Sequence, residues 1–393
     1  MPIFPFPKKK YALTSSRIFA KTVRFSTRII AVALFLLTFI LAIEFIKVGI
    51  EPFSDTLREY IKQYVNSSLA SMGIGWFTSF LTVNSTSIAV LGMNLVGHDI
   101  LNFDEGFYLI LGSRIGSAAV ILFLGIIFYL KGQSYRRSIN VGLLTFLAIL
   151  STSLLAIFFG KILHLLKIDE NMAQALHSPG QGPMTKFISE SFTHNIAAIS
   201  LSQIGPVLTF LIGFIMVILV IELLNKVFYI IDFSEHDFEK NPFRYQLSKL
   251  LRTRFFAFLM GTIIGALTLS ITVTLSILIP LYTHETLVSK IKELFNKNTS
   301  LASRMLIPYA LGANLGSFLD TFVFAKISGS TIGLTLAYNV FLSSLFSILL
   351  LFLIYRIWSD IMIRISNWAL SRPAYLPEII ILLITFPLLL IFH

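Results

Sequence analysis

The sequence predicts an all-α protein that crosses a membrane several times. Of its 393 residues, 55% are hydrophobic and only 13% are Asp, Glu, Lys or Arg, and the mean hydropathy is +0.82. Soluble domains carry about 25% of these charged residues. The apolar runs are long and do not alternate with polar residues, so they predict membrane helices rather than the strands of a β-barrel.

A basic arm, residues 1–26, precedes the first apolar run at about residues 27–48. Positive charge beside a first membrane helix favours the cytoplasmic side, so we expect a multi-pass protein of the cell membrane with a cytoplasmic N-terminus. The run continues into polar residues without a small-residue cleavage site, which indicates a retained helix rather than a signal peptide. Loop charges of this kind account for the net charge of +11 without a nucleic-acid partner.

A broken apolar segment at residues 64–96 follows, with Asn84, Ser85, Thr86 and Ser87 in its middle, and then two helices at about 106–131 and 139–166. The loop before the first of these helices is acidic and the loop after it is basic. A single crossing by the broken segment would put the basic loop outside, against the positive-inside tendency. We therefore predict a re-entrant hairpin, which completes a first repeat at residues 27–166.

The same order recurs after a polar connection at residues 167–195, which we expect outside the cytoplasm. The second series has a helix at about 206–231, a broken segment at 255–282 and two further helices. Basic loops flank the broken segment on both sides, so it too is predicted to be a hairpin. Each repeat then has three crossings, an odd number, and the second repeat, residues 196–357, is inverted relative to the first. Residues 358–393 form a C-terminal segment with a last helix.

A polar motif at membrane depth occurs in both repeats. Ile307–Asp320 contains two glycines, an asparagine, a serine and an aspartate within an apolar stretch, and Leu109–Ser117 is a weaker copy. The two share the skeleton Leu-Gly-x-x-hydrophobic-Gly-Ser, here called the glycine motif. Lipid offers no hydrogen bonds, so such groups must lie inside protein or beside water. Duplicated polar breaks are typical of the binding site of a transporter.

The duplicated order of hairpin and glycine motif resembles the sodium–phosphate cotransporter family, the type II group and its bacterial relatives. The resemblance extends over about residues 31–357 and is strongest at Ile279-Pro280-Leu281 and Ile307–Ser317. It implies a secondary active transporter, not an enzyme, that carries inorganic phosphate or a similar oxyanion by alternating access between the repeats. It also implies sodium as the coupling ion, with no other cofactor and no transition-metal site.

Carried over by position, the hairpin motif of the family falls on Asn84–Ser87 and on Leu269–Thr272. The predicted substrate-binding residues are Asn84, Ser85, Thr86, Ser87, Arg114, Ser270, Thr272 and Asn314. The predicted ion-binding residues are Ser87, Ser117, Thr272, Thr274, Asn314, Ser317 and Asp320. Hydroxyl groups and helix N-termini suit an oxyanion, and hydroxyl and carbonyl oxygens suit sodium.

Two charged residues depart from the pattern of the family. Arg114 stands at the asparagine position of the first glycine motif, and Asp320 stands where the family has a small hydroxyl residue. Arg114 lies about eight residues inside its helix, roughly 12 Å deep, where an unpaired charge costs at least a few kcal/mol. We expect Arg114 either to bind a tetrahedral oxyanion bidentately or to pair with Asp320. A purely structural ion pair, or an arginine that reaches the membrane surface, is the alternative.

Other functions stay open at this point. Arg114 and Asp320 also suit a proton-coupled or uncoupled exporter of another anion, and a membrane sensor without transport is a further reading. An intramembrane enzyme is disfavoured, because Asp320 has no predicted second aspartate or metal cluster beside it. The expected partners are the oxyanion, sodium and the lipid bilayer, and a homodimer is one assembly left open.

Overall fold

A computed structural model describes the chain in several stretches. They are residues 38, 41–42, 44–46, 48–49, 52, 67–130, 135–176, 194–229, 253–276, 305–328, 330–372 and 375–392. Within these stretches the regular secondary structure is helical and includes no β-strand. The predicted basic arm, most of the first helix and the basic loops on either side of the second hairpin lie outside the described residues.

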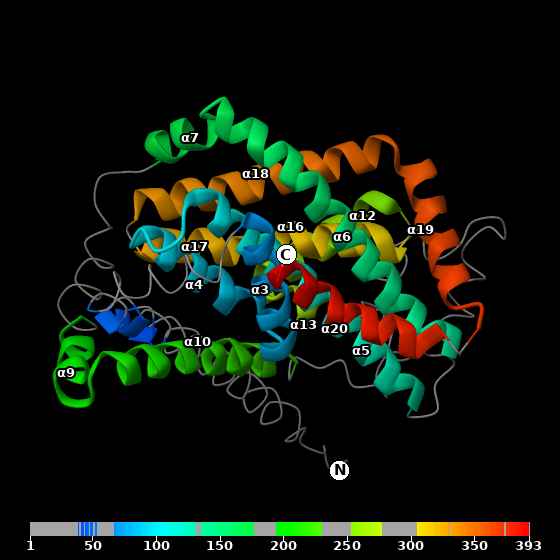
Figure 1. Ribbon diagram of the computed structural model, residues 1–393. Coiled ribbons are helices and arrows are strands. Elements are labelled where there is room, and N and C mark those ends of the chain that lie inside the picture. The colour runs from blue at the N-terminus through cyan, green and yellow to red at the C-terminus, as the bar shows by residue number, and fades with distance from the viewer. Residues whose placement is uncertain are drawn as a thin grey trace, which may run out of the picture.

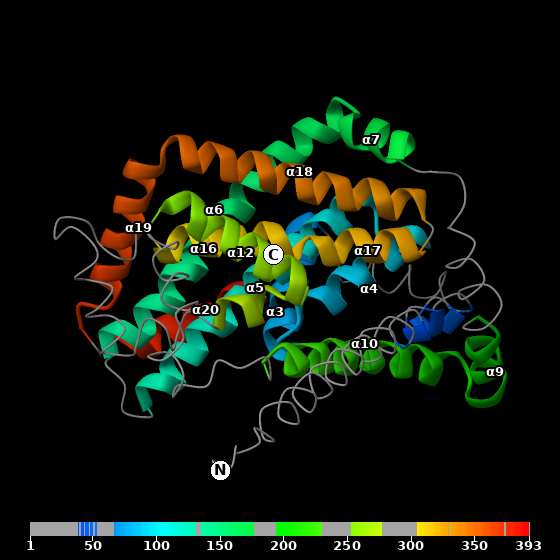
Figure 2. The same cartoon turned by 180° about the vertical axis from the view of Figure 1, so that it is seen from behind.

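The described helices follow one another in a bundle (Figure 1). They are α3 (Ser68–Thr82), α4 (Ser85–Gly97), α5 (Phe103–Leu130), α6 (Tyr135–Leu165), α7 (Ile168–Leu176), α9 (His194–Ile204), α10 (Pro206–Tyr229), α12 (Arg254–Thr268), α13 (Ile271–Ser276), α16 (Ile307–Ser317), α17 (Leu319–Ser328), α18 (Thr331–Leu353), α19 (Tyr355–Ala369) and α20 (Leu376–Phe392). Figures 1 and 2 show α18 and α10 on opposite sides of this bundle.

Three of the described helices are long and apolar enough to cross a membrane, namely α5, α6 and α18. All three run between the same two ends of the bundle. At one end, the Phe103 ring of α5 stacks on His164 of α6, and α7 packs on α18. At the other end, α18 leads into α19, whose Ser366 donates a hydrogen bond to Asn140 of α6 at 2.6 Å. These ends are called the α7 end and the α19 end.

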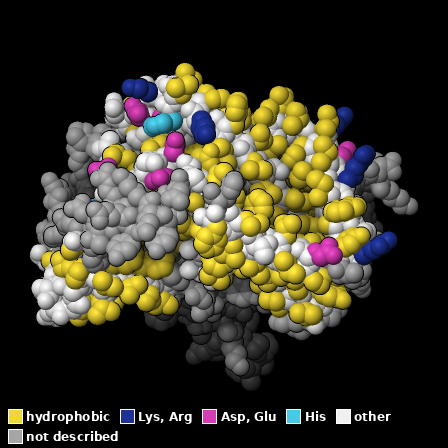
Figure 3. Space-filling view, viewed as in Figure 1, with side chains coloured by type: hydrophobic (Ala, Val, Ile, Leu, Met, Phe, Trp, Pro, Cys, Tyr) yellow, Lys and Arg dark blue, Asp and Glu magenta, His cyan; other side chains and the backbone are white. Residues whose placement is uncertain are grey.

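The surface agrees with a membrane helix bundle. On the face drawn in Figure 3, charged side chains gather near the α7 end and near the α19 end, and hydrophobic side chains cover the area between them. This pattern matches a protein whose middle contacts lipid and whose two ends contact water. The predicted class, an all-helical membrane protein, is therefore confirmed for the described residues.

Both predicted breaks are present, and both have the same backbone conformation. Helix α3 ends at Val83 with φ 57° and ψ 21°, and α12 ends at Leu269 with φ 50° and ψ 26°. The left-handed region is unfavourable for residues with a side chain, and most of all for a β-branched residue such as Val83. A capping residue, Asn84 or Ser270, follows directly and begins the next helix.

The two helix pairs, α3–α4 and α12–α13, reach into the bundle from opposite ends. Gly97, at the close of α4, lies against Ser330, the residue that caps α18 at the α7 end. Arg254, at the start of α12, lies with its guanidinium carbon 4.4 Å from the Tyr355 ring of α19. The breaks themselves meet in the interior, where the Thr86 hydroxyl lies 3.1 Å from the Leu269 carbonyl oxygen.

Close glycine packing holds each helix pair against the helix that follows it. A Cβ on Gly112 of α5 would lie 2.0 Å from the Met72 carbonyl oxygen of α3, and a Cβ on Gly312 of α16 would lie 2.0 Å from the Phe258 carbonyl oxygen of α12. Small residues let membrane helices approach to backbone contact in this way. Figures 1 and 2 show α12 beside α16 from both sides.

The structure differs from the sequence-based expectation at three places. The connection predicted at residues 167–195 contains the helix α7, whose Asp169 accepts a hydrogen bond from the Asn339 amide of α18 at 2.7 Å. The stretch Ile307–Asp320 is two helices, α16 and α17, which part at Phe318. A separate helix, α19, follows α18 and turns across the end of the bundle (Figure 1).

We predict that the glycine contacts set the stability of the bundle. Gly112→Ala and Gly312→Ala place a methyl group inside a backbone carbonyl contact, so each should lower the free energy of unfolding by about 1–3 kcal/mol. Thermal unfolding of the purified protein in detergent measures the effect. Gly97→Ala is the matched control, because its Cβ would lie 3.4 Å from the nearest atom, the Ser330 hydroxyl. Equal melting temperatures for all three variants would contradict this account.

Candidate functional site

The predicted site residues all lie in the interior of the bundle. Each of the twelve exposes 8% or less of its surface. They come from α4, α5, α13, α16 and α17, that is, from both helix pairs and both glycine motifs. Because polar side chains are expensive to bury, especially in a membrane protein, such a concentration needs either internal hydrogen bonds or a bound ligand.

Arg114 of α5 is the centre of a polar network and is completely buried. Its Nη2 lies 2.7 Å from Oδ1 of Asp320, and its Nη1 donates to the Ser317 hydroxyl at 2.7 Å. Nη2 also donates to the Thr321 hydroxyl at 3.0 Å and lies 3.4 Å from the Ser317 carbonyl oxygen. Of the two roles that the sequence leaves open for Arg114, this structure contains the ion pair with Asp320.

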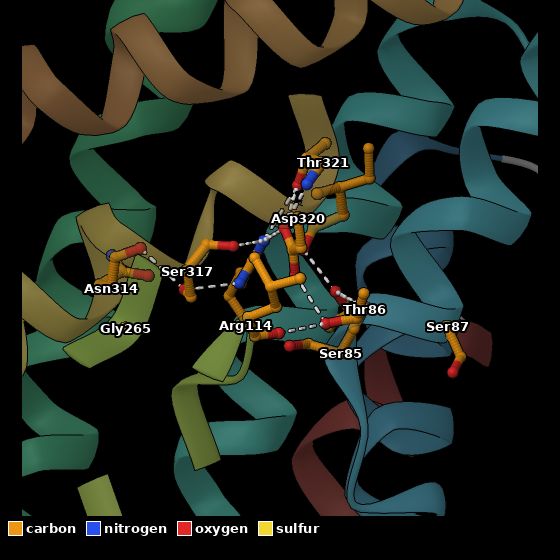
Figure 4. A network of polar contacts seen from close by, with 12 residues as sticks. Ser85, Thr86, Ser87, Arg114, Gly265, Asn314, Ser317, Asp320 and Thr321 are labelled. Atoms are coloured by element: carbon orange, nitrogen blue, oxygen red, sulfur yellow. Dashed lines mark hydrogen bonds and ion pairs between the residues drawn. The ribbon is translucent and has the colours of Figure 1, made fainter. Parts of the chain in front are cut away.

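Asp320 joins this network to the first helix pair. Its Oδ2 accepts a hydrogen bond of 2.6 Å from the Thr86 hydroxyl, at the start of α4. The Thr86 hydroxyl also contacts the Leu269 carbonyl oxygen of the second helix pair, as described above. Figure 4 shows these side chains pointing toward one another. The central network, defined as Thr86, Arg114, Ser317, Asp320 and Thr321, therefore connects both glycine motifs to both breaks.

The ends of α16 and α17 favour this arrangement of charge. The guanidinium group lies at the C-terminal end of α16, where carbonyl groups point outward, and Asp320 lies in the first turn of α17. A helix C-terminus favours a positive charge and a helix N-terminus a negative one. Asp320 accepts hydrogen bonds from both the backbone N–H and the hydroxyl of Thr321. The Phe318 ring, between the two helices, lies 4.4 Å from the guanidinium carbon.

The hairpin motifs cap their own helices. The Asn84 side chain accepts hydrogen bonds from the N–H groups of Thr86 and Ser87, at 3.0 and 3.3 Å. The Ser270 hydroxyl accepts one from the Val273 N–H at 3.4 Å. Asn84 is thus equivalent to Ser270. The motif comparison had aligned Asn84 with Leu269, which is one residue earlier. The correction follows from the backbone, because the left-handed residues Val83 and Leu269 precede the two caps.

Several predicted residues contribute elsewhere than in the central network. The Thr274 hydroxyl bonds to the Ser270 carbonyl oxygen, and the Ser85 carbonyl oxygen lies 3.4 Å from the Ser113 hydroxyl. The Asn314 amide donates to the Thr152 hydroxyl of α6 at 3.2 Å. In Figure 4 the Ser87 side chain points away from Arg114.

Buried polar atoms without a partner belong to five of the predicted residues. Within the described part of the chain, no hydrogen-bond partner is present for the following atoms: Ser87 Oγ, Ser117 Oγ, Thr272 Oγ1, Asn314 Oδ1 and Arg114 Nε. Most buried polar groups are hydrogen-bonded, and an unsatisfied one costs about 1–3 kcal/mol. The three hydroxyl groups and the Arg114 Nε–H can donate hydrogen bonds to an anion, and the hydroxyl oxygens and Asn314 Oδ1 can coordinate a cation.

Sequence reasoning missed two contributors, Thr321 and Phe318. Thr321 follows Asp320 directly, and a hydroxyl residue in the first turn of a helix is a signal that could have indicated it. Phe318 carries no such signal in a chain with 37 phenylalanines. Among the described residues, no group of three or more His, Asp or Glu side chains is placed to hold a metal ion.

We predict strong coupling between Arg114 and Asp320. Removal of either partner leaves a buried charge unpaired, so Arg114→Met and Asp320→Leu should each lower stability by about 3–5 kcal/mol. The double variant should be more stable than either single variant, because no charge is then left unpaired. Thermal unfolding of the three variants in sodium-free detergent buffer measures the coupling free energy between the two residues. Asp360→Asn, on the exposed side of α19, is the control. Additive losses in the double variant would refute the ion pair.

One comparison with known proteins matches the part of the chain that contains Arg114 and the first break. A family model described as Na+/Pi-cotransporter matches residues 38–177, which include α3, α4, α5 and α6 and hence Asn84–Ser87, Arg114 and Ser117. That description names a cotransporter rather than an enzyme. No curated protein and no solved structure matches the chain. Over residues 38–177, the chain is therefore similar to the Na+/Pi-cotransporter family.

Proposed function

We propose that the protein is a secondary active transporter that carries inorganic phosphate, or a similar oxyanion, together with sodium. The observation that carries this proposal is the set of buried polar atoms without a partner on Ser87, Ser117, Thr272, Asn314 and Arg114. Hydroxyl and amide groups of this kind suit both ligands, because a hydroxyl can donate to a phosphate oxygen and can offer its own oxygen to sodium. The family match to a Na+/Pi-cotransporter supports the same ligands.

The two helix pairs act in this proposal as re-entrant hairpins of two inverted repeats. Support comes from their equal backbone breaks at Val83 and Leu269 and from their approach to the interior from opposite ends. Support also comes from reciprocal packing: α4 of the first half contacts α17 of the second, and α13 of the second half contacts α5 of the first. In this arrangement the N-terminus is cytoplasmic, and residues 167–195 lie on the outer side.

The contact between the two breaks supports a transport cycle of alternating access. The contact between Thr86 and the Leu269 carbonyl oxygen joins the two hairpins in the interior, so that movement of one repeat against the other opens the site toward one end at a time. Substrate charge is balanced by sodium and by polar groups on both repeats. The free Nε of Arg114 adds one donor for an oxyanion, whereas its Nη1 and Nη2 are engaged by Ser317, Asp320 and Thr321.

Uptake of radiolabelled phosphate into proteoliposomes tests the function. We expect accumulation when sodium is high outside, and little when potassium or choline replaces it at constant pH. Accumulation that follows a pH gradient and ignores sodium would favour the proton-coupled alternative. Absence of phosphate uptake under all of these gradients would overturn the proposed function.

A second prediction distinguishes a substrate-binding role of Thr272 from a structural role. Thr272→Val removes a buried hydroxyl that has no protein partner, so stability should stay equal or rise while uptake falls by about tenfold or more, since a hydrogen bond to a charged ligand contributes about 1.5–3 kcal/mol. Thr78→Val is the matched control, because the Thr78 hydroxyl bonds the Ile74 carbonyl oxygen of its own helix. Melting temperature and initial uptake rate are measured for both. Unchanged uptake by Thr272→Val would remove this residue from the site.

A further inference from the structure

The guanidinium group of Arg114 is surrounded by oxygen atoms that come from one helix break. These are the Ser317 hydroxyl and carbonyl oxygens, Oδ1 of Asp320 and the Thr321 hydroxyl, at 2.7, 3.4, 2.7 and 3.0 Å from a guanidinium nitrogen. All of them lie within five residues where α16 ends and α17 begins. The side chains of Ser317, Asp320 and Thr321 are fully buried, and so is Arg114.

This set of oxygens has the composition of a site for a small hard cation. Such ions prefer carboxylate, hydroxyl and carbonyl oxygens, and the C-terminal ends of interrupted membrane helices supply those carbonyl groups. A single carboxylate matches a single positive charge. In this chain that charge is a guanidinium group, which reaches the break from the opposite glycine motif.

Only the first of the two glycine motifs contains this charge. Arg114 in Leu111–Ser117 corresponds to Asn314 in Leu311–Ser317. The neutral Asn314 donates to Thr152 within the bundle, whereas Arg114 extends to the motif of the other half and ends beside Asp320. The same backbone position therefore holds an amide in one repeat and a permanent positive charge in the other.

We propose that Arg114 is a built-in cation that occupies the place of a mobile monovalent cation at the α16–α17 break. Replacement of Arg114 by a small neutral residue then leaves Ser317, Asp320 and Thr321 as an oxygen site that sodium fills. The consequence for transport, which rests on the proposed function, is that the natural protein couples its substrate to one sodium ion fewer than the neutral variant does.

Sodium binding to the purified protein tests the cation position without any transport assay. Arg114→Ser should show a sodium-dependent rise in melting temperature, measured against choline, that exceeds the rise of the natural protein by at least about 2 °C. Arg114→Asn copies the second glycine motif and should behave in the same way, which keeps the test available if one of the two variants does not fold. Arg114→Lys retains a positive charge and should respond to sodium like the natural protein.

Two further variants assign the extra response to this break. Arg114→Ser combined with Asp320→Asn removes the carboxylate and should lose the additional sodium response. Arg254→Ser is the matched control, since Arg254 also lies 4.4 Å from an aromatic ring, that of Tyr355, but outside the central network. A sodium response of Arg114→Ser and Arg114→Asn equal to that of the natural protein would overturn the proposal.

The dependence of uptake on sodium concentration tests the coupling. For Arg114→Ser we expect a steeper dependence than for the natural protein, with a Hill coefficient higher by about one. Equal steepness would overturn the coupling part of the proposal. If the natural protein transports no phosphate while Arg114→Ser gains the sodium-dependent stability, the proposed function fails and the cation position stands.

Discussion

The ion pair between Arg114 and Asp320 is the interaction on which the interior of this protein depends. Two full charges are completely buried in a helix bundle with the surface of a membrane protein. Such charges are tolerated only when they face each other and their remaining hydrogen-bonding capacity is used. The pair therefore requires the Arg114 side chain to extend from α5 to the junction of α16 and α17, and it requires Thr86 and Thr321 on the carboxylate. One interaction thus fixes the relative position of four helices.

Helix breaks make this arrangement possible. In a continuous helix, the backbone carbonyl and N–H groups form hydrogen bonds with each other. No backbone oxygen would then be available to Arg114 or Thr86. The breaks at Phe318 and at Leu269 supply those oxygens from Ser317 and Leu269. The strained left-handed conformation of Val83 and Leu269 is offset by the caps that follow and by backbone contact at Gly112 and Gly312. Backbone strain, helix capping and close glycine packing therefore occur together in each helix pair.

The sequence predicted the helical membrane class and the positions of the two breaks. These predictions succeeded because apolar length and isolated polar groups are strong signals when lipid is the solvent. The alignment of the two breaks was wrong by one residue. Val83 and Leu269 are neither glycine nor asparagine, so the sequence gives no sign of their left-handed conformation. The choice of partner for Arg114 could not be read from sequence, because it depends on a contact across about two hundred residues. Helix α19 was missed because its polar and apolar residues alternate around the helix and give no long apolar run.

The two glycine motifs have the same backbone packing but differ in charge. Gly112 and Gly312 make the same close contact, as do Gly116 and Gly316, so the positions that set backbone distance are the same in both. Position 114 and its counterpart 314 lie on this common backbone but differ by a full charge. The buried charge at position 114 needs a counter-charge, and Asp320 supplies it from beside the other glycine motif. In the alternating-access cycle that we propose, this pair joins the two halves that move, so its strength affects the conformational change as well as binding. In the proposed transport cycle, substitution at this pair therefore alters coupling and motion together, whereas the glycine contacts keep the backbone distances unchanged.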